Sequence, residues 1–302
     1  MFALLDNVGL NVLNGRHLNQ QCGYNHLMSV EKAKEAIAIR DIVDLAEMRE
    51  LEDLQKEIWG VADREVFPAL AFRPITAVGG VLLGAFVAGR MAGFVFGFPG
   101  LENDQVILHS DMLAVRPEYR SEGIAYKLKV AQGERALEKR IERITWTFDP
   151  LQLVNASLNF SRLGVISNRY LVNFYGETTS FLHSTGTDRL WLTWHLNSER
   201  VKLRLSEQET ATPSSDFDRA NVLVQVAHDE KPLVATDVSF SGNVVIEIPH
   251  DINSLPSEFK VRWREATRQA FVKTLDNGYL VEDFYRSKRD GIAVGRYLLR
   301  SH

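Results

Sequence analysis

The residues best placed for chemistry lie in one segment, residues 106–125, which reads VILHSDMLAVRPEYRSEGIA. His109 and Asp111 are two residues apart on a strand-like apolar run, so their side chains share one face of the strand. A histidine with an ordinary pKa of about 6.5 accepts a proton near neutral pH, whereas an aspartate needs burial to raise its pKa. The pair offers two candidate general bases, His109 slightly ahead, and purely structural roles for both side chains are an equal alternative.

The same segment continues into a turn that is suited to binding phosphate. Pro117 ends the strand, and Arg120-x-x-Gly123-x-Ala125 opens a helical pattern. The first N–H groups of a helix lack intrahelical partners and the helix dipole adds positive potential, so a helix start attracts anions. Gly123 and Ala125 leave room for a ligand oxygen, and Arg120 can add a charge-assisted contact. An ordinary strand-to-helix turn has the same spacing and is the alternative.

Positioning these residues requires strands and helices in alternation, and the hydrophobic pattern predicts them. Strands are expected at residues 35–40, 75–87, 91–98, 105–115, 144–148, 170–175 and 189–196, and helices at 41–58, 123–139 and 151–163. Further strands are expected at 221–226, 232–240, 243–248, 279–284 and 292–299, with a helix at 257–275. The pattern predicts the α/β (α+β) class.

Composition excludes several classes of function. Of the 302 residues, 45% are hydrophobic and 25% are charged, as expected of a globular protein with a sizeable core. The net charge of −4, with acids and bases mixed along the chain, does not suit a nucleic-acid partner. The longest apolar stretch, 75–87, contains three glycines and is too short to span a membrane. With a single cysteine, Cys22, and no metal-binding cluster, we expect a cytoplasmic protein without a bound metal.

The chain divides by composition into four parts. Residues 1–35 are expected to form a disordered tail, because the first 27 are rich in Asn, Gln and Gly and lack periodicity. Residues 36–198 form the predicted first domain, and the polar stretch 199–220 is a predicted linker. Residues 221–302 are a predicted C-terminal α+β subdomain of unknown role, either a degenerate echo of the first domain or a small appendage. The arginines of its helix are expected on a solvated face.

The segment LAVRPEYRSEGIA resembles the GNAT N-acetyltransferase superfamily, in which such a loop holds the pyrophosphate of acetyl-CoA. The order of elements over residues 36–198 agrees with that family, and the runs TWTFDPL and NFYG resemble a poorly characterised bacterial branch of predicted acetyltransferases. The resemblance implies a GNAT-like mixed, mostly antiparallel sheet flanked by helices, with a C-terminal α+β extension. It also implies acetyl-CoA, or another acyl-CoA, as co-substrate.

The resemblance carries over to individual residues. It implies that the strand backbone contacts the acyl-pantetheine arm, that Asn155 also reaches this arm, and that the Glu122 side chain points to solvent. Phe160 stands where the family often has a proton-donating tyrosine, and Tyr175 is a weak candidate for the missing acid. The implied cofactor-binding residues are Leu113, Ala114, Val115, Arg120, Ser121, Glu122, Gly123, Ile124, Ala125, Asn155 and Phe160.

The resemblance implies an N-acyltransferase that moves acetyl from acetyl-CoA directly to the amine of a small molecule. Trp59, Phe67 and Phe72 border the region where such an acceptor enters, and either an apolar acceptor or core packing explains them. Because Phe160 cannot donate a proton, a non-catalytic acyl-CoA-binding or sensing protein is the alternative. A hydrolase or decarboxylase acting on the acyl-CoA itself is a third. The sequence leaves the acceptor and the oligomeric state open.

Overall fold

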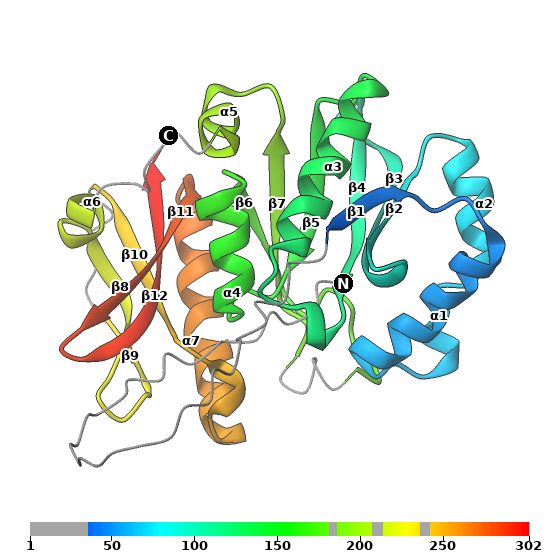
Figure 1. Cartoon of the computed structure of the whole chain (residues 1–302). Helices are drawn as coiled ribbons and strands as arrows, with labels where there is room; N and C mark the ends of the chain where they lie inside the picture. Colours follow the sequence, from blue (N-terminus) through cyan, green and yellow to red (C-terminus); the bar gives the residue numbers. More distant parts are fainter. Residues whose placement is uncertain (1–35, 181–185, 207–213, 236–241, 302) are drawn as a thin grey trace, which may run out of the picture.

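The computed structural model describes residues 36–180, 186–206, 214–235 and 242–301, and the tail predicted at 1–35 lies outside them. In this part of the chain, twelve strands form one sheet in the order β1-β2-β3-β4-β5-β7-β6-β11-β12-β10-β8-β9 (Figure 1). Neighbouring strands are antiparallel except β4–β5 and β8–β10, which are parallel. The predicted mixed, mostly antiparallel sheet flanked by helices is confirmed.

The N-terminal half contains the elements around the predicted site. Its strands are β1 (Ile37–Asp41), β2 (Val81–Val87), β3 (Arg90–Glu102), β4 (Gln105–Val115), β5 (Arg143–Phe148), β6 (Ile166–Leu171) and β7 (Arg189–His195). Its helices are α1 (Leu45–Trp59), α2 (Ala69–Ala77), α3 (Ile124–Glu138), α4 (Leu153–Ala156) and the π-helix η3 (Ser157–Arg162), with 3₁₀ turns η1 (Asp63–Glu65) and η2 (Pro117–Tyr119).

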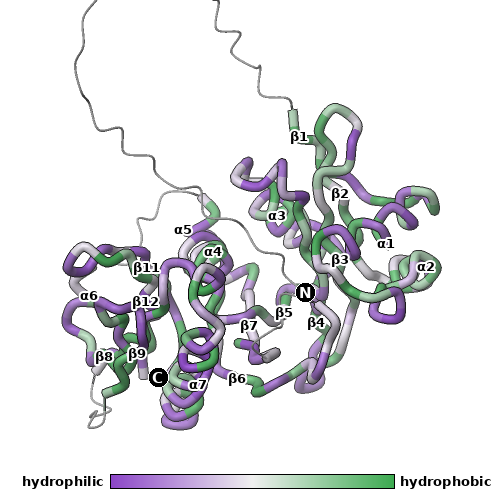
Figure 2. The backbone as a smooth tube through the Cα atoms, turned by 90° about the horizontal axis from the view of Figure 1, so that it is seen from below, coloured by the Kyte–Doolittle hydropathy of each residue, from purple (hydrophilic) through white to green (hydrophobic). Residues whose placement is uncertain are grey.

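The two faces of the sheet in this half pack into two different hydrophobic cores. Leu82 and Phe86 of β2 pack with α1 and α2, whereas Leu83 and Ala85 join the core beneath α3. Successive residues of a strand point to opposite faces, so an unbroken apolar strand such as β2 is expected to be covered on both sides. Figure 2 shows α1 and α2 on one side of β2 and β3, and α3 on the other.

The predicted strand at 75–87 is wrong in its first part. Helix α2 extends through Ala77, and β2 begins only at Val81. Two prolines, Pro68 before the helix and Pro74 within it, hid the helix in the sequence, because an interior proline removes a helical hydrogen bond. Pro74 is the sixth residue of α2, so the helix forms without the hydrogen bond that an N–H at this position would donate to the carbonyl of Leu70.

The C-terminal half forms the other end of the sheet. It contains α5 (Glu199–Leu205), α6 (Ser214–Asp218), β8 (Asn221–Val226), β9 (Pro232–Val234), β10 (Val244–Pro249), η5 (Ile252–Ser254), α7 (Ser257–Asp276), β11 (Tyr279–Arg289) and β12 (Ile292–Ser301). The stretch 199–220, expected as a linker, therefore carries two short helices. Helix α5 docks through Arg204, which donates a 2.7 Å hydrogen bond to the buried Asp283 of β11.

Helix α7 lies on the same face as α3 and α4 and ties the two halves together. Arg264 is only 4% exposed and donates two hydrogen bonds of 2.7 Å to Asp149, which directly follows β5. Arg268 pairs with Asp188 just before β7, at 2.7 and 2.9 Å. The expectation of a solvated arginine face is therefore wrong for Arg264, whereas the Arg268 side chain stays 38% exposed beside its partner. Arg262 is exposed as expected.

Candidate active site

Strands β4 and β5 are paired over a short stretch and then part. Their parallel pairing consists of Leu108 with Ile144 and His109 with Thr145, although both strands continue well past these residues. A β-bulge lies just beyond, because Gly97 of β3 pairs with Ser110 while Phe96 pairs with Met112, which leaves Asp111 as the extra residue. A bulge bends its strand and re-aims side chains. The opening between β4 and β5 therefore begins where Asp111 is displaced.

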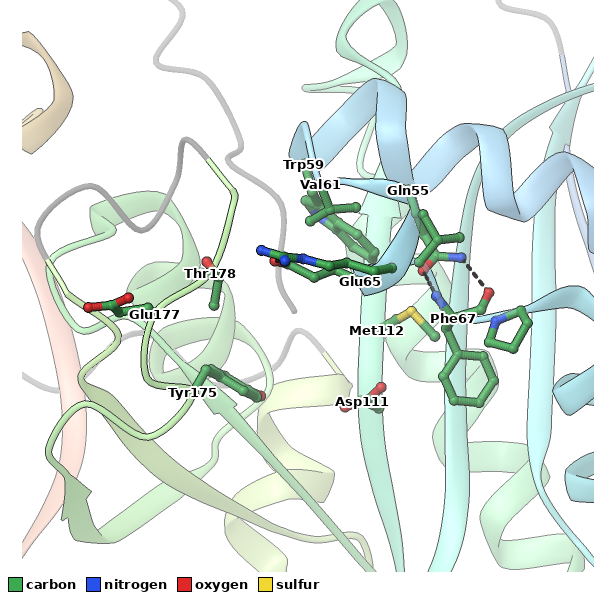
Figure 3. Close-up of a pocket in the computed structure, with 13 residues that line it drawn as sticks. Gln55, Trp59, Val61, Glu65, Phe67, Asp111, Met112, Tyr175, Glu177 and Thr178 are labelled. Atoms are coloured by element: carbon green, nitrogen blue, oxygen red, sulfur yellow. Dashed lines mark hydrogen bonds and ion pairs between the residues drawn. The ribbon is translucent and has the colours of Figure 1, made fainter.

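The bulge places two consecutive side chains, Asp111 and Met112, in one pocket of about 430 Å³. This pocket lies on the α1/α2 face of the sheet, and we call it the acceptor-side pocket (Figure 3). Phe67 and Trp59 line it, although Trp59 is only 1% exposed, whereas Phe72 is fully buried in the core and does not line it. Three carboxylates line the pocket, from Glu65, Asp111 and Glu177, against the single cation of Arg64.

A loop after β6 closes one side of the acceptor-side pocket. The Thr179 N–H donates to both carboxylate oxygens of Glu65, at 3.0 and 3.1 Å. The Ala62 N–H donates to the Thr179 hydroxyl at 2.8 Å, and the Ser180 hydroxyl donates to the Trp59 carbonyl at 2.7 Å. These bonds hold the loop 173–180 against the end of α1.

Tyr175 of this loop faces Asp111 across the opening. The two side chains point toward each other in Figure 3, and both line the acceptor-side pocket. The Tyr175 hydroxyl is 3.1 Å from the Thr147 hydroxyl of β5, and burial raises the pKa of the tyrosine. A carboxylate from β4 and a protonated phenol from the loop 173–180 thus face each other where the strands diverge. Such a pair can accept one proton and donate another.

His109 lies deeper and outside this pocket. Its Nδ1 is 3.0 Å from the Thr145 hydroxyl, and its ring stacks on Trp191 with centroids 5.0 Å apart. Burial lowers the pKa of His109 to about 4, so the imidazole is neutral at pH 7. Its role as a base remains a prediction, and its contacts are those of a packed histidine.

The predicted phosphate loop lines a second pocket, of about 170 Å³, which we call the loop pocket. The loop residues that line it are Arg120, Ser121, Gly123, Ile124 and Ala125, together with Val115 at the end of β4. Gly123 has a φ of +74°, and Ser121 has a φ of +72°, so both adopt the left-handed conformation that glycine favours. Glu122 is exposed, as expected, and does not line the pocket.

Other predicted cofactor residues are less open. Leu113 and Ala114 are buried in the strand, where only their backbone could meet a ligand, and Asn155 of α4 is buried as well. Phe160 is fully buried and packs edge-on against Tyr297 of β12 at 5.7 Å. Its place in the core between the two halves gives a packing reason for the aromatic residue at this position.

Sequence reasoning missed several residues of these pockets. Arg162 and Arg286 line the loop pocket, and Glu65 and Glu177 line the acceptor-side pocket. Each comes from an element far away in the sequence, so no local spacing indicates it. Lys129 of α3 was also missed: it is fully buried, which lowers its pKa, and its Nζ lies 3.1 Å from the Ser110 hydroxyl and 3.6 Å from the centre of the Trp146 ring. It bridges β4 and β5 where they part.

The described residues were also compared with the requirements of a metal site and of a membrane-spanning helix. No set of three or more His, Cys, Asp and Glu side chains among them is arranged to hold a metal ion. None of the helices described is both long and apolar enough to cross a membrane.

Comparison with known proteins yields matches only among solved structures. No protein-family model and no curated protein matches the chain. The ribosomal-protein-S18-alanine N-acetyltransferase of Escherichia coli is 13% identical, with 54% of this chain and 96% of that chain covered and a TM-score of 0.42. A putative GNAT-family acetyltransferase of Desulfovibrio desulfuricans is 14% identical over 53% and 99%, with a TM-score of 0.42. A GNAT-family acetyltransferase of Streptococcus pneumoniae is 13% identical over 52% and 98%, with a TM-score of 0.41. These matches each cover about half of this chain and nearly all of the other chain.

Proposed function

We propose that this protein is an acyl-CoA-dependent N-acyltransferase that moves an acetyl group from acetyl-CoA directly to the amine of a small molecule. One observation carries the proposal: two pockets of opposite charge lie on opposite faces of the sheet, and residues of β4 beyond its short pairing with β5 line both of them. Val115 and Asp111 of the same strand line the two pockets. They are four residues apart, or about 13 Å along a strand. An extended acyl-bearing arm fits this path.

The loop pocket would hold the anionic end of the co-substrate. Arg120 and the N–H groups of the first turn of α3 supply positive potential there, and the positive φ of Gly123 places the loop backbone next to the ligand. The acyl-pantetheine arm would then follow β4, where the backbone beyond His109 is not paired with β5. Backbone N–H groups on this side can stabilise the oxyanion that forms as the thioester reacts.

Direct transfer requires two proton movements. The amine nitrogen attacks the thioester carbonyl carbon, the new C–N bond forms and the C–S bond breaks. Asp111 would accept the proton that the amine loses, and Tyr175 would donate its phenolic proton to the departing thiolate. Tyr175 can take this role because its phenol is protonated at neutral pH, and burial, which raises its pKa, makes it a weaker acid than a free tyrosine. Proton exchange with water then returns both side chains to their starting forms.

The test is to incubate the full chain with acetyl-CoA and a panel of small amines and to measure free thiol together with acetylated product. Amine-dependent thiol release with one acetyl group transferred per thiol is expected. Thiol release without an acceptor would replace the proposal with a hydrolase. Tight acetyl-CoA binding without turnover on any amine would favour the sensing protein, which the buried Phe160 at the family's usual proton-donor position already suggests as the second candidate.

A further inference from the structure

The loop pocket receives residues from both halves of the molecule. Arg120 comes from the loop before α3, Arg162 from the π-helix and Arg286 from β11 of the C-terminal half. Strand β11 reaches this place because it packs on the π-helix: the Ser161 hydroxyl donates to the carbonyl of Phe284, two residues before Arg286. The C-terminal half is therefore a part of the pocket wall.

A second arginine of the loop pocket, Arg162, is held in place by an aromatic ring. The Arg162 guanidinium lies 4.0 Å from the centre of the Tyr126 ring, and Tyr126 belongs to the first turn of α3. Such a contact stabilises a cation and fixes its direction. Arg162 and Arg286 thus border the pocket from a helix and a strand that are themselves in contact.

The charges of the loop pocket are one-sided. Three arginines line it, and no aspartate or glutamate does, although the chain as a whole carries a net charge of −4. Within the described part of the chain, Arg286 is exposed and makes no ion pair with a carboxylate. Like charges gathered at one site repel each other, and a bound polyanion removes that repulsion.

We propose that Arg286 binds a phosphate group of the cofactor, so that the C-terminal half completes the cofactor site. The proposal rests on the proposed function and extends it to a residue outside the GNAT-like half. Coenzyme A carries a diphosphate and a 3′-phosphate. The loop backbone and Arg120 are placed for one phosphate group, and Arg286 with Arg162 supplies charge for another. Guanidinium groups suit this role because they contact phosphate through two parallel hydrogen bonds.

The test measures dissociation constants of the full chain for coenzyme A by titration calorimetry. Arg286→Ala is expected to weaken binding about 10- to 100-fold, as the loss of a hydrogen bond to a charged group does. Lys288→Ala is the matched control: Lys288 is an exposed cation on the same face of β11, two residues further, and does not line the pocket. This control is expected to bind coenzyme A within twofold of wild type. Unchanged melting temperatures would establish that both variants fold.

Titration with 3′-dephospho-coenzyme A identifies the phosphate. If the effect of Arg286→Ala disappears with this ligand, Arg286 binds the 3′-phosphate; if it persists, Arg286 binds the diphosphate. A wild-type chain that binds coenzyme A while Arg286→Ala binds it within twofold would overturn this inference and leave the proposed function standing. A wild-type chain that binds no coenzyme A would overturn both.

Discussion

Asp111 and Tyr175 are the two titratable side chains that the geometry brings face to face at the opening between β4 and β5. Of the two candidate bases, only Asp111 lines the acceptor-side pocket, and it does so because the bulge turns it and Met112 to the same face. His109 shares the strand but is held by Thr145 and Trp191. The proposed choice of Asp111 over His109 therefore rests on a bulge, which the alternation of side chains in the sequence does not reveal.

Asp111→Asn is expected to lower kcat/KM for acetyl transfer by about 100-fold or more, because general-base catalysis is lost at a pocket that still binds both substrates. The matched control is His109→Gln, which removes the other candidate base and is expected to cost less than about tenfold. Steady-state kinetics with the best amine of the panel measures both. A larger loss for His109→Gln than for Asp111→Asn would reverse the assignment.

Tyr175→Phe tests the acid. The variant keeps the ring that lines the pocket and removes the hydroxyl that contacts Thr147. A lowered kcat with an unchanged KM is expected, because protonation of the thiolate matters only as the C–S bond breaks. An acetyl thioester of a CoA analogue with a more acidic thiol should lose less rate in the variant, because its thiolate leaves without protonation. An equal loss for both thioesters would contradict the role.

His109 makes stability depend on pH. Its pKa falls from about 6.5 in the unfolded chain to about 4 in the folded one, so protonation opposes folding. The stabilisation is present above pH 6.5 and is lost as the pH falls toward 4, with an upper value of about 3 kcal/mol. Urea denaturation at pH 7 and pH 4.5 should show a smaller decrease for His109→Phe, which keeps the stacking on Trp191 and cannot titrate. Equal decreases in the two proteins would show that His109 does not contribute.

At the scale of elements, the loop before α3 can be tested with matched glycines. Gly123 of this loop has a φ of +74°, and Gly89, which lies in the turn between β2 and β3, has a φ of +79°. At either position an added Cβ meets no atom within 4 Å. Alanine should therefore cost each variant about 1–2 kcal/mol of stability through backbone strain alone. Only Gly123→Ala should also weaken coenzyme A binding, because its methyl group would enter the loop pocket. Equal affinities for the two variants would contradict the role of the loop.

Helix α7 positions the end of β5 through a buried ion pair. Arg264→Met should destabilise the protein by about 3–5 kcal/mol, because the carboxylate of Asp149 stays buried without its partner. The double variant Arg264→Met, Asp149→Asn should recover most of this loss, since both charges are gone. Chemical denaturation of the single and double variants measures the coupling. Additive losses would mean that the two residues act independently.

Elements coded by local patterns could be predicted from the sequence, and contacts across the chain could not. Strand β4 and helix α3 follow from an apolar run, a proline and a glycine loop that are close in sequence. The pairing of Asp149 with Arg264 joins residues 115 positions apart, and periodicity within α7 cannot show what its arginines face. The position of Arg286 in the loop pocket could not be predicted for the same reason, because β11 is far from the loop in the sequence.

At the scale of the whole molecule, the C-terminal half repeats the topology of one part of the first half, strands β4 to β7. The order β4-β5-β7-β6 is followed by β11-β12-β10-β8, its reverse, and the two runs meet where β6 pairs with β11. Strands β8 and β10 are parallel like β4 and β5, and α7 occupies the position of α4. This favours the degenerate echo over the small appendage among the two alternatives that the sequence left open.

In the C-terminal half, side chains fill the opening between β8 and β10 that corresponds to the opening between β4 and β5. Where β8 and β10 part, the buried Glu247 accepts a hydrogen bond from the Val226 N–H at 3.0 Å, and Arg289 contacts both residues. No helix with a glycine loop separates β8 from β10 in the described residues. The C-terminal half therefore has the strand order of β4 to β7 but no corresponding opening between its parallel strands. Its contribution to the loop pocket is Arg286.

The two halves also share one hydrophobic core, which predicts that they fold together. One continuous cluster runs from Val81 of β2 to Leu299 of β12 and includes Phe160, whose edge faces Tyr297. A fragment of residues 36–206 would expose this surface and leave β6 as an unpaired edge strand, a site for aggregation. The whole chain should unfold in a single cooperative transition by calorimetry, whereas the fragment should aggregate or unfold without cooperativity.

Co-expression of residues 36–206 with 214–302 is the control and should recover soluble protein, because each part supplies the other's missing core. A monomeric fragment that unfolds cooperatively and binds coenzyme A as tightly as the whole chain would show instead that the first half is an independent domain.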